Sequence, residues 1–185
     1  MLNNENNKRI AKNTIFLYTR MLLVMGVSLY TSRIILNALG VIDFGIYNVV
    51  AGVVTFFAFL NGSMAGSTSR FLTIELGKHD LEQFKKVYSV TILNHVFLAI
   101  IIVILAETLG LWFLQNKLVI PVDRKEMAFW VYQFSVLSTF ISIVQVPFLA
   151  TIIAHEDMKI YSLGGVIEAI MKLGTAFLIV FVTFD

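Results

Sequence analysis

Three long intervals without a charged side chain constrain this chain more than any other feature. They cover residues 44–69, 87–106 and 127–155, and are 26, 20 and 29 residues long. A helix needs about 20 residues to cross the hydrocarbon core of a bilayer, and each ionised side chain near its centre costs about 2.5–3.5 kcal/mol. The three intervals therefore predict transmembrane helices.

Two further apolar stretches are long enough to cross although they contain charges. Residues 15–36 contain Arg20 and Arg33, and residues 160–184 contain Glu168 and Lys172. The apolar runs lack the alternation of apolar and polar side chains that membrane β-barrel strands show. We therefore predict an all-α integral membrane protein with about five transmembrane helices. Their expected ranges are 13–37, 43–75, 84–114, 125–154 and 158–184.

The composition agrees with a membrane protein and excludes several other classes. The chain is 58% hydrophobic and 14% charged, whereas a soluble domain carries about 25% charged residues. Without cysteine it has no disulfide scaffold and no cysteine-based zinc site, and a net charge of +2 from scattered residues gives no reason to expect nucleic acid. The sequence contains no catalytic, metal or nucleotide motif, so we expect no enzyme activity and no cofactor or metal.

The basic residues predict the orientation of the chain. If the polar segment 1–12 is cytoplasmic, more lysines and arginines fall on the inner side than on the outer side, as the positive-inside rule expects. Trp112 and Trp130 then lie at the outer interface, where indole rings concentrate. We predict a multi-pass protein with a cytoplasmic N-terminus at residues 1–12 and a membrane domain at residues 13–185.

The first predicted helix carries a polar stripe. At about 100° per residue, Asn13, Arg20 and Thr31 lie within about 20° of one another around the helix axis. One interpretation is that the stripe faces a water-filled cavity or a partner helix, and an ionisable residue at this depth is then a candidate site. The other is that Arg20 extends to the cytoplasmic headgroups while its stem stays in lipid.

Other helices contain polar or small residues with two interpretations each. Glu168 and Lys172 are spaced i,i+4 with the acid first, so they either form a self-neutralising ion pair or hold Lys172 as a substrate contact. His95 lies in mid-span, where it either bonds to a neighbour or relays protons. Gly62 and Gly66 have the spacing that lets helices approach closely, so the second helix either packs closely and protrudes into the cytoplasm or bends there to line a transport site.

Two stretches have motifs that are known from one family. Residues 32–48 read SRIILNALGVIDFGIYN, which contains a Gly-x-x-x-x-Gly-x-Tyr turn, and residues 69–78 contain SRFL followed by ELGK. The first resembles the first hairpin of bacterial polysaccharide (O-antigen type) flippases, and the second resembles the end of their second helix. These flippases belong to the multidrug/oligosaccharidyl-lipid/polysaccharide exporter superfamily.

The resemblance implies two lobes of six or seven helices around a cavity that opens to either side of the bacterial plasma (inner) membrane. It implies that the substrate is a lipid-linked oligosaccharide with an anionic headgroup, flipped for surface polysaccharide synthesis. Membrane lipids and polysaccharide assembly proteins are the other expected partners. Five helices form only part of an N-terminal lobe, so we expect either a fragment of a longer protein or a degenerate product without transport.

The same resemblance suggests where the substrate binds. The family's cavity arginine in the first helix falls on Arg20, and a basic position of the second helix falls on Arg70. Together with the polar residues above, the candidate substrate-binding residues are Asn13, Arg20, Thr31, Arg70, Glu168 and Lys172. An alternative is a multidrug or cation antiporter, which needs an unpaired deep acid; Lys172 beside Glu168 disfavours it. Another alternative is a truncated, non-transporting membrane scaffold.

Overall fold

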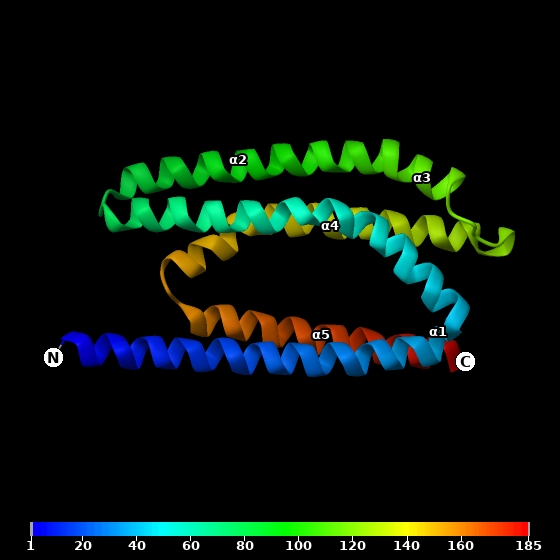
Figure 1. Ribbon diagram of the computed structural model, residues 1–185, viewed down its shortest axis with the longest axis horizontal. Coiled ribbons are helices and arrows are strands. Elements are labelled where there is room, and N and C mark those ends of the chain that lie inside the picture. Colours follow the sequence, from blue (N-terminus) through cyan, green and yellow to red (C-terminus); the bar gives the residue numbers. More distant parts are fainter. Residues whose placement is uncertain (1, 185) are drawn as a thin grey trace. The chain divides into compact units, whose positions relative to one another are not determined.

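The computed structural model describes the backbone of residues 2–184 and the side chains of residues 7, 8, 10–55 and 64–181. In this described part the chain is helical and has no strand, so the predicted all-α class is confirmed (Figure 1). The elements are α1 (Leu2–Gly77), α2 (Leu81–Leu105), the π-helix η1 (Ala106–Gly110), α3 (Leu111–Asn116), the 3-10 turn η2 (Val122–Arg124), α4 (Lys125–Ala154) and α5 (Met158–Phe184).

Four of the described helical segments are long and apolar enough to cross a membrane. They are Ile10–Thr55, Leu81–Asn116, Val122–Ala154 and Met158–Phe181. Only 6–28% of the residues in their most apolar windows are buried by the rest of the chain, and large side chains such as Leu29 and Phe97 are exposed. Helices of water-soluble proteins turn their apolar stripe to a core, whereas these surfaces match lipid tails.

A single glycine divides α1. The segment Ile10–Thr55 has 46 residues, about 69 Å of helix, which is more than twice the hydrocarbon thickness. Gly40 interrupts it with φ 74° and ψ 171°, a conformation that only glycine adopts readily. The break falls between the helices predicted at 13–37 and 43–75, and the connection is shorter than predicted because the residues on either side of Gly40 are helical. The helix also begins earlier than predicted, at Leu2.

The chain forms two compact units. Unit 1 comprises residues 1–44 and 156–185, and unit 2 comprises residues 45–155. In unit 1 the first half of α1 and the whole of α5 lie side by side and run in the same direction (Figure 1). The buried residues of α5 are small and recur every three, four or seven positions, which lets two backbones approach closely. They are Ser162, Gly165, Ala169 and Ala176.

Unit 2 packs the second half of α1 against α2, α3 and α4. Its helix α2 begins at Asp80, whose carboxylate accepts a hydrogen bond of 3.0 Å from the backbone N–H of Gln83, the usual arrangement of an N-terminal cap. Three apolar clusters form the core. Their buried members are Val50, Val54, Ala106, Leu114, Ala128, Tyr132 and Val136 in the first, Leu72, Ala150 and Ala154 in the second, and Ala99, Ile102 and Ile143 in the third.

Polar side chains also join α4 to the π-helix η1. The fully buried Tyr132 donates a hydrogen bond of 2.7 Å from its Oη to the carbonyl of Ala106. Beside it, Gln133 Nε2 donates to Glu107 Oε2 over 3.1 Å. A π-helix is a local widening of an α-helix that is frequent at functional sites, and here it turns a backbone carbonyl toward α4.

Candidate functional site

Arg20 lies in a slot on α5 within unit 1. Its guanidinium carbon is 4.3 Å from the centre of the Tyr161 ring, a cation–π distance. Its Nε is buried and has no hydrogen-bond partner. Gly165 forms the floor of the slot, because a Cβ atom on this glycine would collide with the Arg20 side chain. The polar stripe of the first helix thus faces a partner helix, whereas a contact between Arg20 and a substrate stays a prediction.

Two hydroxyl groups on the same helix pair are also buried without a partner. Thr31 on α1 is 1% exposed and Ser162 on α5 is 6% exposed, and neither side-chain oxygen has a hydrogen bond. Asn13, the remaining member of the stripe, is half-buried. A buried polar group without a partner costs about 1–3 kcal/mol, so each of these atoms needs an explanation. A ligand or water that reaches this face would supply the missing partners.

The predicted ion pair between Glu168 and Lys172 does not form. Lys172 Nζ instead donates a hydrogen bond of 3.3 Å to Ser28 Oγ on α1. Glu168 is exposed and makes no ion pair in the described part of the chain. The i,i+4 spacing permits the pair but adds only about 0.2–0.5 kcal/mol, so a tertiary contact across the two helices competes easily with it.

The remaining candidate, Arg70, belongs to unit 2, where its side chain is exposed. The structure therefore places Asn13, Arg20, Thr31 and Lys172 on one helix pair of unit 1. No three histidine or acidic side chains gather as metal ligands within the residues that were placed.

Sequence reasoning missed Tyr161 and Gly165, which form the slot for Arg20. A usable signal was present, because Ser162, Gly165 and Ala169 repeat small residues on one face of α5. The small-residue spacing that we chose instead lies on α1. There a Cβ on Gly66 would meet no atom within 4 Å, and the side-chain position of residue 62 lies outside the described residues.

The chain matches no protein-family model, no curated protein and no solved structure. The resemblance to polysaccharide flippases accordingly depends on the residues quoted for it, at 32–48 and 69–78. The structure adds that the break in α1 falls on Gly40, the first glycine of the Gly-x-x-x-x-Gly-x-Tyr turn.

Proposed function

We propose that this chain moves a lipid-linked oligosaccharide across the bacterial plasma membrane for surface polysaccharide synthesis, as part of the N-terminal lobe of a two-lobed exporter. The observation that carries the proposal is the slot of Arg20. A permanently charged guanidinium lies on an apolar helix with a buried Nε–H that has no partner. Guanidinium groups bind phosphate oxygens in a forked geometry, and lipid-linked sugars carry a phosphate or pyrophosphate group.

The helix pair offers further groups for such a headgroup. Thr31 and Ser162 have unused hydroxyls, and Lys172 is held on the same pair through Ser28. Ser28, which contacts Lys172, lies eight residues after Arg20, about 12 Å along the helix axis. We propose that Arg20 and Lys172 contact the anion at two separate points along its path. An anion that leaves water must exchange its hydration for such contacts. Because the sequence holds no nucleotide motif, we propose passive or ion-coupled transport.

The test is complementation of a strain that lacks the gene with the full-length protein. Arg20→Ala should lower surface polysaccharide by at least about a hundredfold, since two hydrogen bonds to a charged group contribute about 1.5–3 kcal/mol each. Arg20→Lys should restore only part of it, because an ammonium lacks the planar fork. The matched control is Arg33→Ala, which removes an exposed arginine from the same half of α1 and should leave export unchanged.

Immunoblots of isolated membranes would confirm that every variant inserts at the level of the wild type. Normal export by the inserted Arg20→Ala protein would overturn the proposal. Equal export by the lysine and arginine forms would show that Arg20 does not bind phosphate through a forked contact.

A second candidate, a cation or multidrug antiporter, gains from one observation. The acid in α5 that such a mechanism needs, Glu168, is exposed and not ion-paired in the described part of the chain. Glu168→Gln separates the two functions in the same strain. An antiporter loses ion-driven drug efflux with this substitution, whereas a passive flippase keeps its surface polysaccharide.

A further inference from the structure

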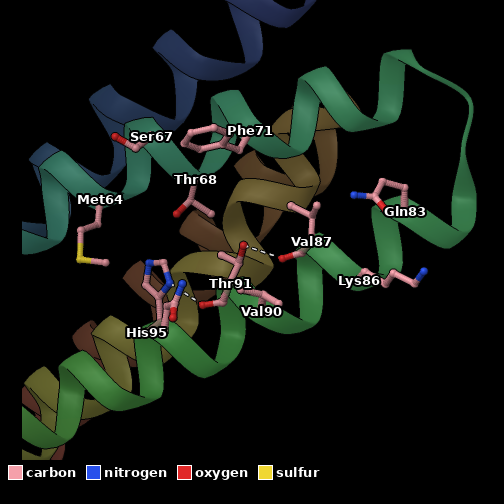
Figure 2. Close-up of a pocket in the computed structure, with 11 residues that line it drawn as sticks. Met64, Ser67, Thr68, Phe71, Gln83, Lys86, Val87, Val90, Thr91 and His95 are labelled. Atoms are coloured by element: carbon pink, nitrogen blue, oxygen red, sulfur yellow. Dashed lines mark hydrogen bonds between the residues drawn. The ribbon is translucent and has the colours of Figure 1, made fainter.

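Unit 2 contains a cavity of about 530 Å³ between the second half of α1 and the start of α2 (Figure 2). Its volume is in the range of about 300–1,000 Å³ that is typical of small-molecule sites. Thr68 and Phe71 line it from α1, and Lys86, Thr91 and His95 line it from α2. None of its described lining residues is acidic.

His95 gives the cavity a specific chemical preference. It is 2% exposed, and its Nδ1 lies 2.8 Å from the backbone carbonyl of Thr91. A carbonyl only accepts hydrogen bonds, so Nδ1 carries the proton and Nε2 of the neutral ring is an acceptor. Nε2 is buried and has no partner. For the neutral ring, the group that completes this histidine is therefore a donor, such as a hydroxyl.

Thr91 presents a second acceptor one turn away. Its hydroxyl proton is already used, because Oγ1 donates a hydrogen bond of 2.7 Å to the carbonyl of Val87. The lone pairs of Oγ1 therefore remain for a donor in the cavity. Thr91 and His95 are about 6 Å apart along α2, so the helix offers two acceptors in sequence along one wall. A phosphate or carboxylate, which only accepts hydrogen bonds, cannot satisfy them.

The rest of the lining suits a ring with several hydroxyl groups. Figure 2 shows Thr68 and Phe71 on the α1 wall, a hydroxyl and an aromatic face respectively. Met64, an unbranched and adaptable side chain, lines the same wall. Lys86 lies about 14 Å from His95 along α2 and adds a cation for an anionic link.

We infer that this cavity binds a sugar residue of a glycolipid, with ring hydroxyls donating to His95 and Thr91 and the phosphate link near Lys86. The inference rests on the proposed function, for which it names a sugar subsite. The cavity shares no residue with the slot of Arg20, because all its lining residues belong to unit 2 and Arg20 belongs to unit 1.

The test uses the full-length protein in phospholipid vesicles and a photoreactive glucosyl polyprenyl phosphate as the probe. Peptide mapping should locate the label on α1 near residues 64–71 and on α2 near residues 83–95. His95→Phe keeps a flat ring but removes the acceptor, and it should lower labelling about tenfold, the effect of one lost hydrogen bond in a desolvated site. His95→Gln, whose side-chain oxygen can accept, should restore part of it.

The chain offers a matched control in His155. Its Nδ1 makes the same contact with the carbonyl of Thr151, at 2.9 Å, but the ring is exposed and does not line the cavity. His155→Phe should leave labelling unchanged. Helix content and size-exclusion behaviour of each variant would show that it folds.

Two outcomes would overturn the inference. One is equal labelling by the sugar-free polyprenyl phosphate or by phosphatidylglycerol, which would show a lipid or phosphate site. The other is labelling that His95→Phe does not change. Transport by Arg20→Ala is measured separately, so a failure of the sugar subsite is distinguishable from a failure of the flippase proposal.

Discussion

Two helix pairs in this molecule differ in whether their buried polar groups have hydrogen-bond partners. Between α2 with its π-helical continuation and α4, the buried hydroxyl of Tyr132 donates to the carbonyl of Ala106. On α1 and α5, by contrast, Arg20 Nε, Thr31 Oγ1 and Ser162 Oγ are buried without any partner. The hydroxyl of Tyr132 therefore has its partner, whereas the pair of α1 and α5 has open hydrogen-bonding capacity.

The difference separates structural packing from a binding surface. A polar atom that stays unpaired in an apolar surrounding lowers stability, so packing alone does not favour the arrangement on α1 and α5. Protein interiors tolerate such atoms where they serve function, because a ligand or water then completes them. Single substitutions test this difference between the two helix pairs.

After Arg20→Ala itself, the largest effect is expected at Gly165. An alanine Cβ there collides with the Arg20 side chain, so Gly165→Ala should displace the guanidinium and lower export about tenfold, equivalent to about 1.4 kcal/mol. The neighbouring Gly164→Ala is the control, because a Cβ at that position meets no atom within 4 Å. Surface polysaccharide is the measurement. Equal export by both variants would show that the slot does not position Arg20 for function.

Much of the fold could be predicted because the free energy of inserting a residue into a bilayer depends mainly on the type of that residue. The charge-free intervals predict the membrane spans, since each buried charge has a cost that does not depend on the rest of the fold, and the lack of alternation between apolar and polar side chains makes those spans helical. Even the break in α1 was signalled, because the turn motif at residues 32–48 contains Gly40.

The contacts between helices could not be predicted in the same way. Whether Arg20 meets Tyr161 depends on how two helices, 141 positions apart in sequence (161 − 20), are rotated about their axes. The local rule paired Glu168 with Lys172, but a contact to Ser28, 144 positions away, replaces that pair. The cavity beside His95 also needed the structure, because its two walls come from different helices.

The next substitution tests the hydrogen bond between Tyr132 on α4 and Ala106. Tyr132→Phe removes the hydrogen bond to Ala106 without changing the ring and should lower the free energy of unfolding by about 1 kcal/mol. The measurement is unfolding in mixed micelles titrated with sodium dodecyl sulfate. Tyr18→Phe, at an exposed tyrosine, should change it by less than about 0.5 kcal/mol. An equal effect of the two substitutions would contradict a structural role for the bond.

The smallest effect is expected at Thr31. It is the most informative one, because this substitution should raise the free energy of unfolding, whereas Tyr132→Phe should lower it. Thr31→Val keeps the shape of the side chain and removes a buried hydroxyl that has no partner, so the same measurement should give a gain of about 0.5–1 kcal/mol. Thr73→Val is the control, since that threonine is exposed and bonded to the carbonyl of Ser69. Export should fall with Thr31→Val although the protein becomes more stable. A loss of stability would mean that the hydroxyl already has a partner, and the contrast between the two helix pairs would then disappear at this position.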